Sequence, residues 1–135
     1  MDAGQCLFLN MKKIIAENAP KAIGPYSHAW QSGNLVFCSG QTPLNPSTMQ
    51  IEGATVSEQT TLVLSNLETV LKAAGCDRSN VIKTSVFLKN FADFEKMNKA
   101  YEAFFGDHKP SRTTVEVSRL PKEALVEIEC IAEVR

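Results

Sequence analysis

Two segments with the composition of strands are apolar at consecutive positions, and this pattern limits the fold more than any other feature. They are Leu35-Val36-Phe37-Cys38 and Val86-Phe87-Leu88. A strand with one face in water alternates apolar and polar side chains, so a continuous apolar run indicates a sheet buried on both faces. The chain must therefore cover two faces itself or obtain one cover from a partner.

Two segments have the apolar periodicity of a helix. Thr55 and Glu58 have the spacing of a capping box, and Gly75 supplies the left-handed residue that ends the helix. A second amphipathic segment ends at Gly106. Apolar residues recur at helical spacing in both: Val63, Leu67, Val70, Leu71 and Ala74 in the first, and Phe94, Met97, Tyr101, Phe104 and Phe105 in the second.

Strands are expected at residues 12–16, 35–39, 81–88, 112–117 and 126–134. The order of strands, helix, strand, helix and two strands predicts an α+β fold, with two helices packed on one face of a mixed sheet. Because two helices cover only one face, we expect the other face to pack against a second copy of the chain. The sequence thus predicts a homo-oligomer.

The chain has 135 residues, enough for one domain, which we assign to residues 12–135. The segment before it lacks the basic start and long apolar region of a secretory signal. We interpret residues 1–11 as a leader or a vector-derived segment. No apolar run approaches the roughly 20 residues that span a bilayer, so no membrane partner is expected.

Charge and cysteine usage exclude several classes of protein. The formal net charge is −1, which provides no positive field for nucleic acid. The four cysteines are far apart in the sequence, and with two histidines they give no zinc-ligand spacing. We expect a reduced, metal-free, cytoplasmic protein.

Arg112 and the glutamates of the last strand are the strongest candidates for chemistry. The planar guanidinium of Arg112 can bind a carboxylate through two charge-assisted hydrogen bonds, although a solvated arginine at a strand edge fits the same pattern. Glu127, Glu129 and Glu133 share one strand face. They form either a plain solvent face or, at a subunit junction, carboxyl groups suited to proton transfer or water orientation.

The other candidates have simple structural explanations as well. Tyr26 follows Gly24-Pro25 and is either a packing residue or a ligand contact. Ser39 and Gly40 end a buried strand, where glycine lets a backbone N–H approach a ligand closely. Asn98 borders the apolar stripe of the second helix, on the surface or in a pocket, and Thr114 fits an ordinary strand position.

Several short motifs occur in a characteristic order along residues 12–135. They are GPYS at 24–27, SGQ at 39–41, KTSVFL at 83–88, YEAFF at 101–105, PSRTTVEV at 110–117 and VEIE at 126–129. In this order and spacing they resemble the RidA/YjgF family of reactive intermediate deaminases, also called the L-PSP endoribonuclease family. The resemblance implies a chorismate-mutase-like protomer in a homotrimer with clefts between the subunits.

The resemblance also implies an activity. Family members hydrolyse enamines and imines, such as 2-aminoacrylate and related 2-imino acids, to 2-keto acids and ammonia without a cofactor. This is 2-iminobutanoate/2-iminopropanoate deaminase activity. Arg112 matches the arginine that binds the substrate carboxylate, and Glu127 matches the glutamate that positions the attacking water. The positions that line the cleft are matched by Tyr26, Ser39, Gly40, Asn98 and Thr114.

Two other functions stay open at this point. A ribonuclease or translation inhibitor, an activity attributed to some family members, would need a basic track and an acid–base pair. A chain with a net charge of −1 and two separated histidines offers little of either. A non-catalytic sensor or chaperone for a small ligand would use the same cleft and the same arginine, so Arg112 alone does not separate it from an enzyme.

Overall fold

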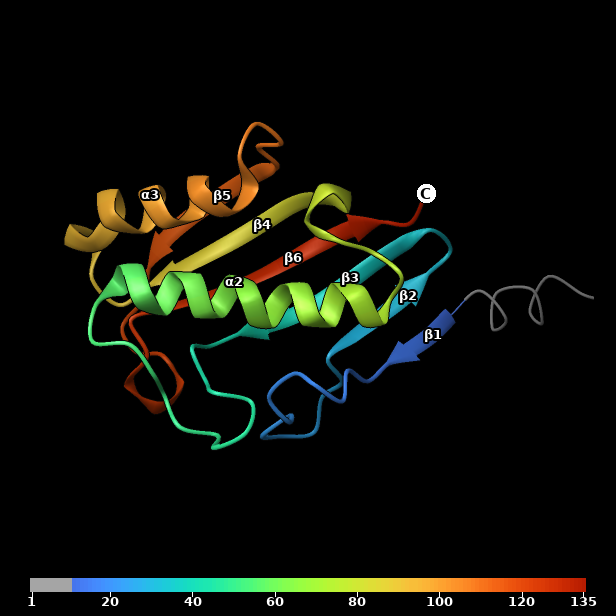
Figure 1. Cartoon of the computed structure of the whole chain (residues 1–135), viewed down its shortest axis with the longest axis horizontal. Helices are drawn as coiled ribbons and strands as arrows, with labels where there is room; N and C mark the ends of the chain where they lie inside the picture. Colours follow the sequence, from blue (N-terminus) through green and yellow to red (C-terminus); the bar gives the residue numbers. More distant parts are fainter. Residues whose placement is uncertain (1–10) are drawn as a thin grey trace, which may run out of the picture.

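The computed structural model describes residues 11–135, in which a six-stranded sheet carries two helices on one face (Figure 1). This confirms the predicted α+β class. The helices are α2 (Val56–Ala73) and α3 (Phe94–Phe105). The strands are β1 (Met11–Ile14), β2 (Ala29–Ser32), β3 (Leu35–Gln41), β4 (Val81–Leu88), β5 (Ser111–Glu116) and β6 (Val126–Glu133).

The sheet is mixed, as predicted, with the strand order β1-β2-β3-β6-β4-β5. Every neighbouring pair is antiparallel except β4 and β5, which are parallel. Parallel strands need a crossover connection, and α3 provides it. As a result β5 lies at one edge of the sheet with α3 beside it (Figure 1).

The ends of α2 match the expected signals. The Thr55 hydroxyl accepts a hydrogen bond from the backbone N–H of Glu58 at 3.2 Å. Gly75 follows the helix with a φ of 78°, a conformation that favours glycine. The second helix ends before Gly106, again as predicted.

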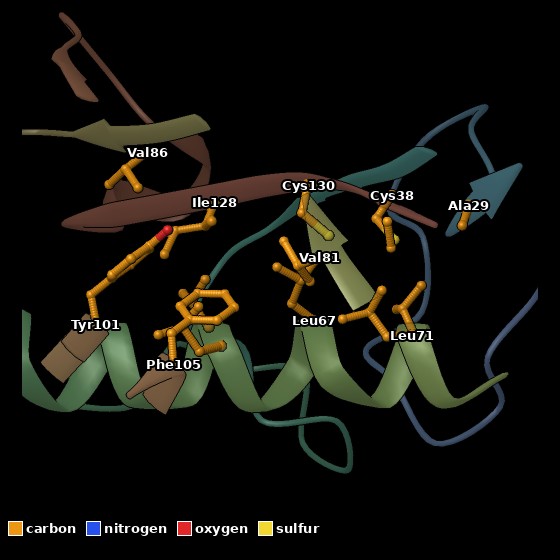
Figure 2. Close-up of a cluster of buried hydrophobic side chains, with 14 of the residues drawn as sticks. Ala29, Cys38, Leu67, Leu71, Val81, Val86, Tyr101, Phe105, Ile128 and Cys130 are labelled. Carbon is orange, nitrogen blue, oxygen red and sulfur yellow. The ribbon is translucent and has the colours of Figure 1, made fainter. Parts of the chain in front are cut away.

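One face of the sheet, called here the helix face, lies under α2 and α3 and forms the core of the protomer. Its side chains from β3, β4 and β6 alternate with those of the opposite face and are almost completely buried. They pack against the apolar stripes of both helices (Figure 2). Buried members drawn in Figure 2 include Cys38, Leu67, Leu71, Val86, Tyr101, Phe105, Ile128 and Cys130.

Cys38 and Cys130 lie directly opposite each other on β3 and β6. Both thiols are free and buried, where cysteine packs as a small apolar side chain. Hydrogen bonding to Cys38 and burial raise the pKa of the Cys130 thiol far above its usual range. The pair therefore acts as apolar packing rather than as a nucleophile.

The other face of the sheet, called here the open face, has no helix over it. Trp30, Phe37 and Ile131 follow one another across β2, β3 and β6 in the strand register. Phe37 is 45% exposed and Trp30 is 41% exposed. On β5 the side chain of Val115 is likewise exposed. Burial under the helices thus accounts for the apolar residues that point to the helix face, but not for those that point to the open face. Burial of the open face by a second copy stays a prediction.

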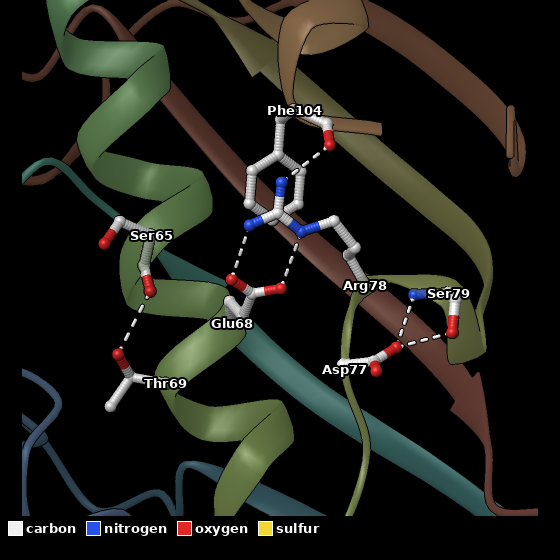
Figure 3. Close-up of polar contacts among 7 residues, drawn as sticks. All are labelled: Ser65, Glu68, Thr69, Asp77, Arg78, Ser79 and Phe104. Atoms are coloured by element: carbon white, nitrogen blue, oxygen red, sulfur yellow. Dashed lines mark hydrogen bonds and ion pairs between the residues drawn. The ribbon is translucent and has the colours of Figure 1, made fainter. Parts of the chain in front are cut away.

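Arg78, in the short turn Arg78–Asn80, ties the two helices together (Figure 3). Its guanidinium donates two hydrogen bonds of 2.7 Å to the Glu68 carboxylate of α2. It also donates to the backbone oxygen of Phe104 in α3 at 2.8 Å and lies 3.9 Å from the centre of the Phe104 ring. These contacts satisfy a carbonyl near the end of α3 and fix the last turn of that helix.

The structure differs most from the sequence expectations in three places, while the bounds of β5 and β6 differ by one residue. The first strand begins at Met11, one residue earlier than expected, and ends at Ile14, two residues earlier than expected. β3 continues to Gln41, beyond the expected end at Ser39, because Gln41 pairs with Ile128 across a register shift. β2 was not expected at all.

The leader assigned to residues 1–11 lies outside the described residues except for Met11. No described helix is long and apolar enough to cross a membrane.

Candidate functional site

Arg112 lies on β5 in register with Thr84 of β4, so its side chain is on the helix face beside α3. The guanidinium carbon is 4.8 Å from the centre of the Tyr101 ring and 5.7 Å from that of Phe94. Within residues 11–135 it forms no ion pair with a carboxylate. Arg112 is therefore a half-buried cation whose hydrogen-bond donors are available to an anion from outside the protomer.

A pocket of about 320 Å³ opens between the end of α3 and the start of β5. Arg112 forms part of its wall together with Asn98, Tyr101, Glu102, Phe105, Lys109 and Pro110. The pocket combines aromatic walls with two cationic side chains, Arg112 and Lys109, and one carboxylate, Glu102, so its positive excess suits a small organic acid.

Two polar groups beside Arg112 are buried without partners. Within the part of the chain that the structure describes, three buried side-chain atoms lack a hydrogen bond, and Asn98 Oδ1 and Thr114 Oγ1 are two of them. Thr114 follows Arg112 by two residues on β5 and so shares its face. Buried polar atoms are nearly always paired, so two unpaired ones near an unpaired arginine indicate a place for a ligand or water. We call Arg112, Asn98 and Thr114 the arginine half-site.

Tyr26, Gly40 and Glu127 line a second, smaller recess of about 40 Å³. The recess is large enough to hold a water molecule. Ser39, the residue before Gly40, donates a hydrogen bond from its hydroxyl to the backbone oxygen of Ser27 at 2.7 Å and so holds the turn that carries Tyr26. We call Tyr26, Ser39, Gly40 and Glu127 the glutamate half-site.

The close approach of Gly40 to Glu127 explains why a glycine stands at this position. A Cβ atom on residue 40 would lie 2.9 Å from Oε2 of Glu127, closer than such atoms normally come. The Glu127 side chain is half-buried, and burial raises its pKa, with a further increase from the charge of Glu129. A carboxyl group with a raised pKa is suited to accept and return a proton.

The two half-sites do not meet within one protomer. Glu127 is opposite Phe87, which is opposite Val115 in the next strand, so Glu127 and β5 are two strand spacings apart, about 10 Å. Arg112 is three residues further along β5, about another 10 Å. The two side chains also point to opposite faces of the sheet. A small acid bound to Arg112 therefore does not reach Glu127 of the same chain.

Tyr101 belongs to the site and was not among the residues predicted for it. The sequence shows it as one of several aromatic residues of the second helix, and its phenol is the only feature that sets it apart there. In the structure that hydroxyl forms a hydrogen bond of 2.7 Å with Thr84 Oγ1, while the ring contacts Arg112. The one feature of the sequence that could have indicated a role for Tyr101 is its hydroxyl group in a helix stripe otherwise rich in phenylalanine.

Both histidines have structural partners. His28 is buried; its Nδ1 accepts a hydrogen bond from the Ala16 backbone N–H at 2.9 Å, and its Nε2 donates to the Pro20 carbonyl oxygen at 2.8 Å. His108 is hydrogen-bonded through Nε2 to the backbone oxygen of Val81. The histidines thus hold loops in place, and although His28 lines the recess of the glutamate half-site, both of its ring nitrogens are already hydrogen-bonded.

Fold and site together define a small α+β protein with a candidate pocket for an organic acid at the edge of its helix face, while the other face of the sheet is uncovered. The family model described as Endoribonuclease L-PSP matches residues 16–134. The chain belongs to this family, the RidA/YjgF family, as the sequence motifs predicted.

Relatives with names and structures agree with this assignment. A RutC family protein of Pyrococcus horikoshii is 51% identical over 123 residues, which cover 90% of this chain and 98% of the relative. The 2-iminobutanoate/2-iminopropanoate deaminase of Escherichia coli K12 is 45% identical over 124 residues, covering 90% and 96%. The crystal structure of E. coli TdcF with bound serine superposes with a TM-score of 0.87 at 41% identity, over 92% of this chain and 99% of that one.

Proposed function

We propose that the protein hydrolyses reactive enamines and imines, 2-aminoacrylate and related 2-imino acids, to 2-keto acids and ammonia. It would thus be a 2-iminobutanoate/2-iminopropanoate deaminase. The observation that carries this proposal is the arginine half-site, where an unpaired guanidinium shares a pocket with Asn98 and a strand face with Thr114, each of which has a buried oxygen without a partner. The deaminase name of the E. coli relative and the amino acid bound to TdcF support the same class of ligand.

The complete site would form between two copies of the chain. The arginine half-site holds a cation for the substrate carboxylate, and the glutamate half-site holds a carboxyl group and a water-sized recess. Because one small substrate does not reach both within a protomer, we propose that a neighbouring copy supplies the second half-site. The exposed apolar residues of the open face would be buried in this assembly, a homotrimer.

The proposed reaction uses three groups in sequence. Arg112 binds the substrate carboxylate and so fixes the adjacent carbon, C2, in the site. Protonation of C3 by solvent converts the enamine to the iminium ion. A water held by Glu127 and a backbone carbonyl near Thr114 then adds to C2 while Glu127 accepts its proton, giving a carbinolamine. Return of that proton to nitrogen releases ammonia, and loss of the remaining hydroxyl proton to solvent leaves the 2-keto acid, so one water is consumed for each ammonia formed.

A ribonuclease is less well supported, although the family model carries that description. RNA cleavage by general acid–base catalysis needs available proton donors and acceptors. Both ring nitrogens of His28 form hydrogen bonds to the backbone, and Nε2 of His108 is hydrogen-bonded to a backbone oxygen. The open face carries Glu127, Glu129 and Glu133, which repel a phosphate backbone.

The deciding assay generates 2-aminoacrylate in situ with a serine dehydratase and follows the release of pyruvate. Wild type should accelerate release, and Arg112→Ala should return it to the uncatalysed rate. Arg119→Ala, which removes an exposed arginine outside the two half-sites, is the matched control and should keep wild-type activity. Full activity in Arg112→Ala would refute the proposed mechanism.

The same assay separates the alternatives. A wild-type protein that binds 2-keto acids without accelerating pyruvate release would be a sensor or chaperone. Nuclease activity that survives in Arg112→Ala would indicate a separate site or a contaminant. A cytoplasmic location, beside the pyridoxal-phosphate enzymes that release such intermediates, stays a prediction.

A further inference from the structure

We propose that Tyr101 is a positioning residue for Arg112, and that its ring holds the guanidinium in the orientation that binds a carboxylate. The inference rests on the proposed function for the identity of the ligand. Its geometric part, the dependence of the Arg112 conformation on Tyr101, can be tested without any ligand.

The first observation is the placement of the guanidinium against aromatic rings. Its central carbon lies 4.8 Å from the centre of the Tyr101 ring and 5.7 Å from that of Phe94. A cation above an aromatic face is attracted by the negative charge of the ring face. The donors of an arginine lie in the plane of the guanidinium, so a contact through its face leaves the N–H groups at its edge free.

The second observation is that Tyr101 is itself held firmly. Its side chain is buried, and its hydroxyl shares a hydrogen bond of 2.7 Å with Thr84 Oγ1. The ring of Phe105, one turn later on α3, packs against it with the ring centres 4.7 Å apart. Burial raises the pKa of Tyr101, so the phenol stays neutral and the hydrogen bond to Thr84 persists at physiological pH.

These contacts form a closed set of three residues. Thr84 is the register partner of Arg112 across β4 and β5, so the two backbones are joined by the sheet. Thr84 is joined to Tyr101 by a side-chain hydrogen bond, and the Tyr101 ring contacts Arg112. Within residues 11–135 the guanidinium forms no ion pair, although Glu102 lines the same pocket. The sheet and α3 together therefore fix a cation that would otherwise be a flexible side chain at a sheet edge.

The last turn of α3 is also fixed from the opposite side. Arg78 hydrogen-bonds the Phe104 carbonyl oxygen and the Glu68 carboxylate of α2, which holds the helix end that carries Phe105 (Figure 3). Phe104 itself contacts the Arg78 guanidinium rather than that of Arg112. Phe104 thus offers a matched control, because it is an aromatic residue on the same helix with a cation contact directed away from the pocket.

The experiment compares Tyr101→Leu, Tyr101→Phe and Phe104→Leu. The side-chain NMR signals of Arg112, assigned with Arg112→Lys, should carry a ring-current shift in wild type. Tyr101→Leu should abolish most of that shift and weaken the binding of 2-ketobutanoate about tenfold. The KM for the imine should rise by a similar factor, with kcat changed less than about threefold. Tyr101→Phe should keep the shift and bind within about threefold of wild type, and Phe104→Leu should change neither.

Two outcomes would overturn the inference. Wild-type Arg112 signals and wild-type binding in Tyr101→Leu would show that the ring does not position the guanidinium. An equal loss in Phe104→Leu would show that general packing of α3 is responsible. If wild type fails to accelerate pyruvate release but Tyr101→Leu still shifts the Arg112 signals and weakens keto-acid binding, the deaminase proposal fails and the role of Tyr101 stands.

Discussion

The two faces of the sheet are built from the same strands but differ in burial: one is covered by helices and the other is exposed. On the helix face, Val86 and Ile128 are completely buried beneath α2 and α3. On the open face, Phe37 is 45% exposed even though it belongs to the same apolar run as Val36 and Cys38. The difference shows that the helix face is the core of one chain, whereas the open face is apolar without a cover of its own.

The proposed site follows the same division. Arg112 lies at the edge of the helix face beside Tyr101, and Glu127 lies on the open face beside Gly40. The surroundings of Arg112 and of Glu127 are each formed within one chain, but the sheet separates the two side chains. A complete site therefore forms only where the open face of one copy meets the arginine half-site of another.

The largest expected effect is on assembly and comes from a charge placed on the open face. Phe37→Asp introduces a carboxylate into the row formed with Trp30 and Ile131, where burial of an unpaired charge is costly. We expect a folded chain whose sedimentation mass is that of one protomer, with pyruvate release at the uncatalysed rate. Ser65→Asp, on the exposed side of α2, should leave both mass and activity unchanged. A wild-type mass of one chain at micromolar concentration would contradict the assembly.

The next effect is expected from Glu127→Gln, which keeps the shape of the side chain and removes its proton-accepting ability. Loss of a general base lowers kcat about 100-fold, with little change in KM. Glu133 is an exposed glutamate on the same strand, and Glu133→Gln should keep kcat near wild type. A kcat of Glu127→Gln within about threefold of wild type would remove Glu127 from the mechanism.

The same variant should also show a pH-dependent gain in stability. Burial raises the pKa of Glu127 in the folded chain, so the folded state binds the proton more tightly than the unfolded state. Wild type should lose stability as the pH rises from the unfolded pKa to the raised folded pKa, and Glu127→Gln should not. Thermal melts should place the variant above wild type at pH 7 and level with it at pH 3. An equal difference at both pH values would contradict this assignment.

A smaller effect should come from Gly40→Ala. The new methyl group would stand 2.9 Å from Oε2 of Glu127, so the carboxyl group must shift away from its recess. We expect kcat to fall about tenfold, which corresponds to about 1.4 kcal/mol of transition-state stabilisation, while the fold is kept. In a Glu127→Gln background the same change should cost much less, because the two residues act through one contact. Equal losses in both backgrounds would separate Gly40 from Glu127.

The sequence predicted the elements with strong local signals. Thr55, Glu58 and Gly75 mark the ends of α2 because caps depend on neighbouring residues alone. β2 was missed because its four residues, Ala29–Ser32, follow a turn-rich stretch and are too few to show a period. That strand is defined by its pairing with β3, which is a tertiary property.

The site was predictable in part from the family motifs. They indicated Arg112, Asn98 and Thr114; in the structure Arg112 and Asn98 line one pocket, and Thr114 lies on the same face of β5 as Arg112. Spacing alone left Arg112 as an ordinary surface arginine. Its role depends on the parallel pairing of β4 with β5, which puts it beside the Tyr101 ring, and no local pattern contains that pairing.

The central claim is that each active site combines Arg112 of one chain with Glu127 of another, and a mixing experiment tests it directly. Arg112→Ala and Glu127→Gln chains, each expected to have about 1% of wild-type activity or less when alone, are unfolded together in equal amounts, refolded and assayed for pyruvate release. With random assembly, about a quarter of the junctions between copies carry both native residues, so about a quarter of wild-type activity should return. If both residues came from the same chain, no site would be complete and the mixture would stay inactive, which would contradict the account.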